Sequence, residues 1–230
     1  MPDETRWTSS IQVDADGTVV DRYDKRPPVP FGEFVPMRDA LDWFPPLRQI
    51  PRDTLAGDGP HSFLVDGHRV AAAICFETLF GELVRTNVLA APQDAGLVVA
   101  TTTDASYGFS SEPAQHLAQS QLRAVETGRW VVHAAQSGSS AFIDPHGKLY
   151  DQTALFETTT LRRDVPIVAG RTPYLVVGDI VGDVARWAVA AGLLLLAAAR
   201  VRASASPEGA MSTTVVSSPR RASQRAIRSR

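Results

Sequence analysis

The alternation of apolar and polar positions predicts short strands paired in hairpins. Residues 10–13 alternate, residues 14–17 hold two Asp and a Gly that favour a turn, and residues 18–20 return along the first strand. A second hairpin is predicted over residues 62–75, with Asp66-Gly67 at its turn. Its return strand is apolar on both faces, which is typical of a strand that is covered on each side.

The remaining pattern predicts helices between further strands. Helical spacing joins Leu79, Phe80, Leu83, Val84 and Val88. A second helix is predicted from Glu112 to about Thr127, with Gly128 as its stop and with Leu117, Leu122 and Val125 on its inner side. Further strands are predicted at residues 96–100 and 130–132, and a last hairpin at residues 140–150. Strands that alternate with helices and hairpins predict an α/β fold with a mixed sheet.

A proline-rich stretch from Pro27 to Pro51 interrupts this pattern. Its prolines exclude long regular elements, so we expect a loop that lies over the body of the domain. Loops of this length often carry function.

The last apolar block favours a membrane helix. Trp187 to Ala199 are thirteen uncharged residues, too few to cross ~30 Å of hydrocarbon at ~1.5 Å each. Extension back to Ile180 reaches spanning length but includes Asp183 and Arg186. Two arginines directly after the block favour a span over residues 180–201 with a cytoplasmic C-terminus, the alternative being a buried core helix.

Composition and charge limit the classes of protein. A chain of 230 residues with 44% hydrophobic residues can bury one sizeable core. The net charge of -2 is uneven, because residues 200–230 hold seven arginines and one acidic residue. The body is therefore acidic and a poor candidate for nucleic acid, whereas the tail suits an anionic membrane surface. We expect residues 202–230 to be a disordered basic tail.

Three residues are candidates for chemistry. Cys75 is the single cysteine, so it is either a small buried hydrophobe or a nucleophile at a strand-to-helix turn. Lys25 is one of two lysines in a chain that otherwise uses Arg, and Glu33 follows it in the proline-rich loop. A surface lysine and a solvated glutamate are the alternative. The histidines show no metal-ligand spacing and no glycine-rich loop is present, so we expect neither a metal nor another cofactor.

Short motifs in a fixed order carry a family resemblance. They are Tyr23-Asp24-Lys25, Val29-Pro30-Phe31-Gly32-Glu33-Phe34-Val35-Pro36, Ile74-Cys75-Phe76-Glu77, Asp104-Ala105-Ser106-Tyr107-Gly108, Pro113-Ala114-Gln115-His116, residues 123–129 and Arg171-Thr172-Pro173-Tyr174. With these motifs the sequence resembles the apolipoprotein N-acyltransferases, membrane-embedded members of the nitrilase, or carbon-nitrogen hydrolase, superfamily. The resemblance extends over about residues 7–200.

The resemblance implies a partial α-β-β-α sandwich over residues 1–174, facing the extracytoplasmic side of the plasma membrane. It implies a Glu-Lys-Cys triad in which Cys75 is the nucleophile, Lys25 the lysine and Glu33 an additional glutamate that places the lysine. Phe76 would supply an oxyanion-binding N–H, and Glu77 matches a family position associated with the active site. The implied reaction moves an acyl group from a phospholipid through a Cys75 thioester to the N-terminal diacylglyceryl-cysteine of a lipoprotein.

The sequence also departs from the family pattern. The family's general-base glutamate precedes the lysine by many tens of residues, whereas 24 residues precede Lys25 here, so we expect the activity of this chain to be impaired. Ser106 replaces an aromatic residue, Phe76 replaces a Tyr, and Pro27-Pro28 replaces His-Leu. Two alternatives stay open, a non-catalytic membrane-attached module and a nitrilase-type amidase.

Overall fold

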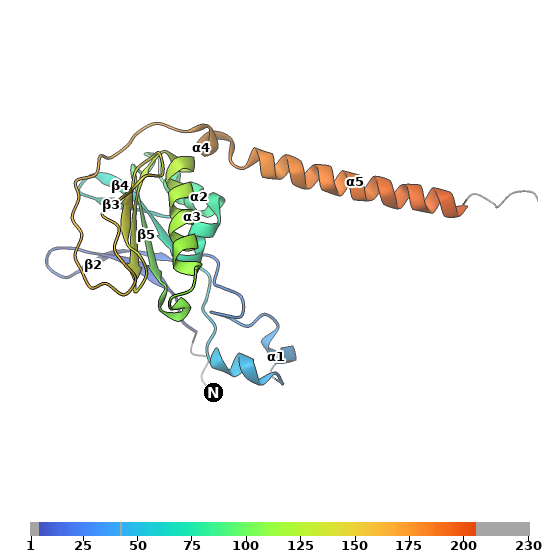
Figure 1. Cartoon of the computed structure of the whole chain (residues 1–230), viewed down its shortest axis with the longest axis horizontal. Helices are drawn as coiled ribbons and strands as arrows, with labels where there is room; N and C mark the ends of the chain where they lie inside the picture. Colours follow the sequence, from blue (N-terminus) through green and yellow to red (C-terminus); the bar gives the residue numbers. More distant parts are fainter. Residues whose placement is uncertain (1–4, 42, 206–230) are drawn as a thin grey trace, which may run out of the picture. The chain divides into compact units, whose positions relative to one another are not determined.

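The computed structural model describes residues 5–41 and 43–205, and the strands of this part form two sheets (Figure 1). β1 (Ser9–Val13) and β2 (Val19–Asp24) form the first predicted hairpin. The second sheet consists of β3 (Ser62–Val65), β4 (His68–Ile74), β5 (Leu97–Thr103), β6 (Trp130–Gln136), β7 (Ala141–Ile143) and β8 (Leu149–Tyr150), in that spatial order. Its central strands β4, β5 and β6 are parallel and its outer pairs are antiparallel, which confirms the mixed sheet.

Two helices pack on this sheet, α2 on β4 and α3 on β6. The helical elements of the first 180 residues are α1 (Arg38–Leu41), η1 (Pro45–Gln49), η2 (Cys75–Leu79), α2 (Gly81–Val88), η3 (Ala105–Tyr107), α3 (Glu112–Thr127) and α4 (Pro173–Val177). α3 ends as the sequence predicts, because Gly128 adopts the left-handed conformation with φ 63°.

Strand β4 is apolar on both faces because each face meets a different layer. Ala71 and Ala73 belong to the main core, which also contains Val84 and Val88 of α2. Ala72 and Ile74 face the opposite way and form a second cluster, which contains Tyr23 of β2. The β1–β2 hairpin therefore covers the face of β4 that the helices leave open.

The predicted inner side of α3 is wrong in part. Leu117 is buried, but Leu122 and Val125 are 46% and 48% exposed. At ~100° per residue, a position five residues after Leu117 lies far around the helix. The buried face carries Ser120, Ala124 and other small or polar residues instead.

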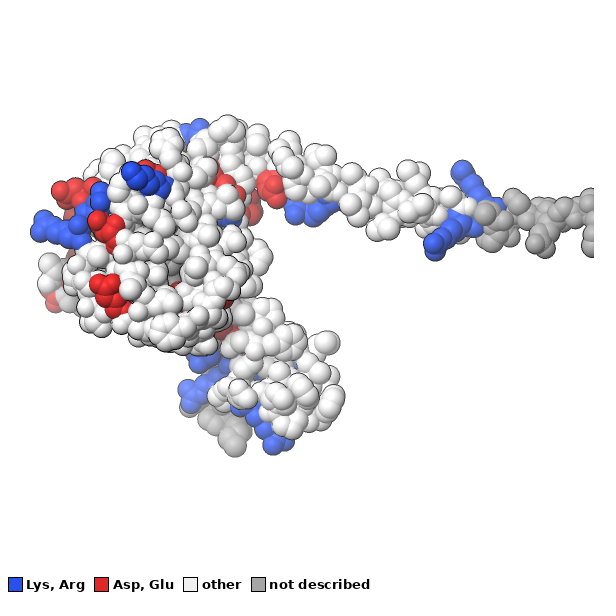
Figure 2. Space-filling model, viewed as in Figure 1, with Lys and Arg blue, Asp and Glu red and all other residues white. Residues whose placement is uncertain are grey.

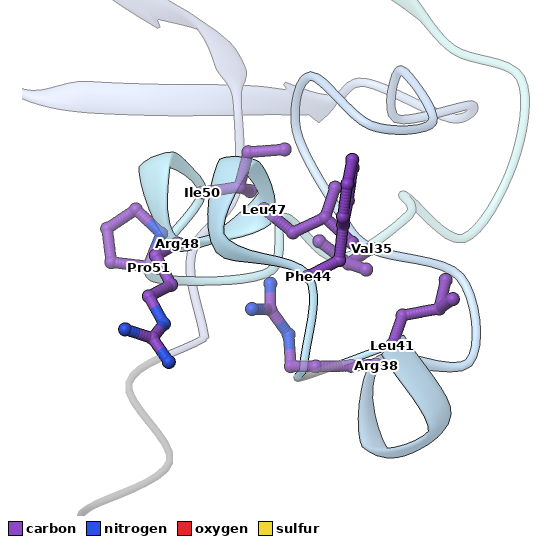
Figure 3. Close-up of a pocket in the computed structure, with 8 residues that line it drawn as sticks. All are labelled: Val35, Arg38, Leu41, Phe44, Leu47, Arg48, Ile50 and Pro51. Atoms are coloured by element: carbon purple, nitrogen blue, oxygen red, sulfur yellow. The ribbon is translucent and has the colours of Figure 1, made fainter.

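The proline-rich stretch is ordered as two short helical turns, α1 and η1. Over residues 36–51 the chain forms local backbone hydrogen bonds, such as Leu47 N–H to the carbonyl of Phe44 and Ile50 N–H to the carbonyl of Leu47, whereas the Glu33 carbonyl accepts from the more distant Thr54 N–H. A cavity of about 210 Å³ lies within it, lined by Val35, Arg38, Leu41, Phe44, Leu47, Arg48, Ile50 and Pro51 (Figure 3). Met37 and Trp43 are 77% and 74% exposed.

The chain divides into two compact units, Met1–Ile180 and Val181–Arg230. Helix α5 (Ile180–Ala205) contains a stretch, Ile180–Arg202, that is long and apolar enough to cross a membrane. None of its apolar window is buried within the structure, which argues against the buried core helix. Figure 2 shows charged atoms on this helix only toward its two ends.

The predicted disordered tail, residues 202–230, begins inside α5, and residues 206–230 lie outside the described part of the chain.

Candidate active site

The turn that carries Cys75 is held in a strained backbone conformation. Strand β4 ends at Ile74, and η2 begins at Cys75 itself. Cys75 has a φ of 50°, which costs an L residue about 1 kcal/mol. Its side chain is half-buried and packs against the cluster around Tyr23. Strained strand-to-helix turns expose nucleophiles in hydrolase folds, so this position suits an attacking thiol.

Lys25 is a buried cation that is paired with Glu33. Its side chain is fully buried, and Nζ donates to the two carboxylate oxygens of Glu33 at 2.9 and 2.8 Å. The backbone N–H of Val29 donates to the same carboxylate at 2.7 Å. A buried ammonium without a partner costs several kcal/mol, so Glu33 makes the burial of Lys25 tolerable. The surface lysine and solvated glutamate of the alternative interpretation are therefore wrong.

Glu77 connects the segment around Lys25, at the end of β2, to the turn of Cys75. Its carboxylate is fully buried and accepts hydrogen bonds from both segments. One oxygen accepts from the hydroxyl of Tyr23 at 2.6 Å and from the N–H of Arg26 at 2.8 Å. The other oxygen accepts from the N–H of Ile74 at 2.7 Å. One carboxylate thus binds residues on either side of Lys25 and the residue just before Cys75.

Arg26 and Asn87 extend this connection to helix α2. A guanidinium nitrogen of Arg26 donates to the carbonyl of Leu83 at 2.6 Å and to the side-chain oxygen of Asn87 at 3.0 Å. Asn87 in turn donates to the carbonyl of Ala72 at 2.7 Å and to the Tyr23 hydroxyl at 3.1 Å. Burial and the charge of Glu77 raise the pKa of Tyr23 to about 12, so Tyr23 is neutral and acts as a donor.

A buried histidine contacts the same turn from the helix side. His116 of α3 is 3% exposed, and its Nε2 lies 3.1 Å from the carbonyl oxygen of Cys75 and 2.9 Å from Oγ1 of Thr78. Its Nδ1 lies 3.1 Å from a carboxylate oxygen of Asp104, at the end of β5. Gly138 packs against Asp104 so closely that a Cβ there would lie 2.1 Å from the second carboxylate oxygen.

Tyr107 lies on η3 within electrostatic reach of the candidate residues. Burial raises its pKa, and the negative charges of Glu112, Cys75, Asp104 and Glu33 raise it further. The pKa of this phenol therefore responds to the charges of both Cys75 and Glu33.

The described residues contain a group that could reach a common metal ion, although the sequence shows no such spacing. Ligand atoms of Asp104, Glu112 and His116 lie within 4.8 Å of one another. Both ring nitrogens of His116 already have protein partners. We therefore interpret the group as a hydrogen-bond network rather than a metal centre.

The structure brings several of the sequence-predicted site residues together. Lys25 and Glu33 form an ion pair, and Glu77 joins the segment around Lys25 to the turn that holds Cys75 and Phe76. Sequence reasoning missed the connections made by Tyr23, Arg26, Asp104 and His116. Three of these four lie inside the motifs of the resemblance, which was the available signal, but no spacing indicated their partners.

The carbon-nitrogen hydrolase family model matches residues 2–172 of this sequence. The chain belongs to the carbon-nitrogen hydrolase family. Its fold is the mixed α/β nitrilase-type fold that the resemblance implied.

Within this family the chain is similar to apolipoprotein N-acyltransferases. The protein of that name from Pasteurella multocida is 39% identical over 160 residues, which cover 69% of this chain and 30% of that protein. The one from Nitrosomonas europaea is 36% identical over 159 residues, which cover 68% and 31%. The chain thus spans about a third of the length of the curated relatives it matches.

Among solved structures, an amidase of the nitrilase superfamily from Nesterenkonia AN1 is 20% identical. It matches with a TM-score of 0.48, over 66% of this chain and 54% of that chain.

Proposed function

We propose that this chain carries the nucleophile-bearing part of an apolipoprotein N-acyltransferase, with Cys75 as the nucleophile. The observation that supports this most directly is the buried Lys25–Glu33 pair, together with the Glu77 carboxylate that ties the flanks of Lys25 to the turn of Cys75. A buried cation whose neighbours in the chain are hydrogen-bonded to a strained thiol turn is costly in folding free energy, and such arrangements are typical of catalytic sites.

In the first step the Cys75 thiolate attacks the ester carbonyl of a phospholipid. The new C–S bond forms as the carbonyl oxygen gains a negative charge. Glu33 takes two of the three ammonium hydrogens of Lys25, which leaves one for that oxyanion. The Phe76 N–H would be the second donor. The ester C–O bond then breaks, and the lysophospholipid leaves as an alcohol with the proton that the thiol gave up.

In the second step the α-amine of a diacylglyceryl-cysteine lipoprotein attacks the thioester. An amide bond forms, the C–S bond breaks, and the amine proton returns to the sulfur. Helix α5 would hold the domain at the membrane where both lipids reside, with the domain outside and the basic end in the cytoplasm. The expected impairment of the activity stays a prediction.

Acylation of Cys75 tests the proposal. The full chain is placed in vesicles of phosphatidylethanolamine that carries a labelled acyl chain. It should gain one labelled acyl group on Cys75, which is detected by mass spectrometry of the peptide that contains Cys75. Hydroxylamine should release the label, and Cys75→Ser should remove the thioester. Lys25→Met should lower the rate of acylation roughly 100-fold or more, as loss of an oxyanion donor does.

The same experiment separates the alternatives. Release of ammonia from primary amides, with no label from phospholipid, would identify an amidase. If neither this chain nor a version extended by its upstream coding sequence acylates Cys75, the non-catalytic membrane-attached module is correct. Extraction of the chain from membranes by salt or carbonate would contradict the span at residues 180–201.

A further inference from the structure

The carbonyl of Cys75 belongs to the same peptide group as the N–H of Phe76. Any donor that binds this carbonyl draws electrons toward its oxygen and makes the N–H at the other end a stronger donor, because hydrogen bonds polarise one another through a peptide. Two side chains reach this carbonyl from the buried side. Thr78 Oγ1 donates to it at 3.0 Å, and His116 Nε2 lies 3.1 Å from it.

The partners of His116 indicate where its protons are. At Nδ1 the ring faces a carboxylate oxygen of Asp104, which accepts. At Nε2 it faces two oxygens, the Cys75 carbonyl oxygen at 3.1 Å and Thr78 Oγ1 at 2.9 Å. The carbonyl oxygen can only accept, and the Thr78 hydroxyl donates its one hydrogen to that same carbonyl, so both oxygens act as acceptors toward Nε2. A neutral imidazole has one N–H and would turn a lone pair toward one of these acceptors. A ring with protons on both nitrogens, balanced by the Asp104 carboxylate, satisfies both contacts.

The surroundings are consistent with one positive charge at this place. The titratable groups that face His116 are Asp104 from β5, Glu112 from its own helix, His133 from β6, and Cys75. Burial and, to a smaller extent, the charge of His116 lower the pKa of His133 to about 3, so His133 is neutral. Asp104 is 1% exposed, which leaves its charge strongly coupled to His116.

We propose that Asp104, His116 and Thr78 polarise the Cys75–Phe76 peptide and so strengthen the Phe76 N–H as the oxyanion donor. His116 is then a positioning residue that acts through the peptide and does not touch the sulfur or the substrate. This inference rests on the proposed role of Cys75 as an acyl-accepting nucleophile, but not on the identity of the acyl donor.

Two reagents separate this role from a general effect on the thiol. Acetylation of Cys75 by p-nitrophenyl acetate passes through an oxyanion, whereas alkylation by iodoacetamide is a displacement at carbon with no oxyanion. Both need the thiolate, so the ratio of their rates cancels changes in thiolate fraction and in access. The full chain in detergent micelles is compared with His116→Ala, His116→Gln, Thr78→Val and, as a matched control, His68→Ala at an exposed strand start.

We expect His116→Ala to lower the acetylation-to-alkylation ratio about tenfold, less than the roughly 100-fold that outright loss of an oxyanion donor costs. Thr78→Val should lower the ratio about threefold, since it removes the weaker of the two polarising donors. His116→Gln should recover part of the loss, because its amide can donate to the same carbonyl. His68→Ala should leave the ratio unchanged. An unchanged ratio in His116→Ala, including one that results from equal losses in both rates, would overturn the proposal.

A second measurement needs no activity. In ¹⁵N-labelled protein at pH 7, both ring nitrogens of His116 should show the shifts of protonated nitrogens, and the amide proton of Phe76 should move upfield in Thr78→Val and in His116→Gln. A lone-pair shift at Nε2 would overturn the proposal even if Cys75 accepts no acetyl group. The acetylation-to-alkylation ratio could respond as expected while phospholipid forms no thioester on Cys75. That result would support this inference and would reject phospholipid as the acyl donor.

Discussion

The turn around Cys75 and the segment over residues 36–51 belong to one unit of the chain but are held in opposite ways. The turn is fixed by buried polar groups whose partners lie far away in sequence, such as Tyr23 to Glu77 and His116 to the Cys75 carbonyl. The segment is held by local backbone hydrogen bonds, and its large side chains Met37 and Trp43 stand in solvent. Asp53 links the segment to the residues that flank it, because its carboxylate pairs with Arg38 of the segment and accepts from the N–H of Val35, just before the segment.

This difference indicates which part of the molecule contributes most to the stability of the fold. Buried polar networks specify one geometry when every member is satisfied and are costly when one member is lost. Exposed apolar side chains contribute little to folding and leave a surface that can change shape. We therefore expect substitutions at the turn to disturb folding and reactivity together, and substitutions of the exposed side chains in the segment to leave folding nearly unchanged.

The largest effect should come from Glu77→Ala. It leaves the Tyr23 hydroxyl and the N–H groups of Arg26 and Ile74 buried without an acceptor, so we expect a loss of about 3 kcal/mol or more in the free energy of unfolding. Urea unfolding of the full chain in micelles measures it. Glu82→Ala, on an exposed carboxylate nearby, is the control and should change stability by less than about 0.5 kcal/mol. Similar small losses in both variants would show that the network is not what holds the turn.

Alkaline pH should weaken the same network through Tyr23. Its folded-state pKa is raised from 10.0 to about 12, so the folded state holds the phenol proton more tightly than the unfolded state. The contribution is present in full below pH 10 and is lost as the pH rises through 12. It amounts to roughly 2–3 kcal/mol.

Tyr23→Phe isolates this contribution. Between pH 9 and pH 12 the native chain should lose about 2–3 kcal/mol more stability than the variant does. Parallel pH profiles for the two proteins would contradict a buried, Glu77-bonded phenol.

Backbone strain at Cys75 should give a smaller effect. Glycine adopts a positive φ without penalty, so Cys75→Gly should be about 1 kcal/mol more stable than Cys75→Ala, which keeps the strain. Both variants lack the thiol, so the comparison measures only the backbone. Equal unfolding free energies would show that the turn is not strained in solution.

The smallest effect is expected in the segment over residues 36–51. Trp43→Ser removes a large apolar side chain that is 74% exposed, and it should change the free energy of unfolding by no more than about 0.5 kcal/mol. Thermal unfolding of the full chain in micelles is a sufficient measurement. A loss above about 1.5 kcal/mol would mean that Trp43 is covered in solution and that the contrast with the Cys75 turn is wrong.

Local signals predicted much of the fold. The turn residues of both early hairpins, the Gly128 stop of α3 and the two-sided apolar run of β4 each depend on neighbours within a few residues. The inner face of α3 was not predictable in this way. Its buried positions include His116 and Ser120, which are polar and are accommodated only because Asp104 and His133 provide partners.

The sequence by itself determined the hairpins, the strands and the two helices of the sheet, their order, the family and the place of Cys75 at the end of a buried strand, because periodicity, turn chemistry and motifs are local. Only the tertiary structure decided that Lys25 is buried, that Glu77 joins the segment around Lys25 to the Cys75 turn and that His116 contacts the Cys75 carbonyl. The contacts from Glu77 to Arg26 and from His116 to Cys75 join residues 51 and 41 positions apart. The partner of a buried polar group is set by how distant elements pack, and no local pattern encodes it.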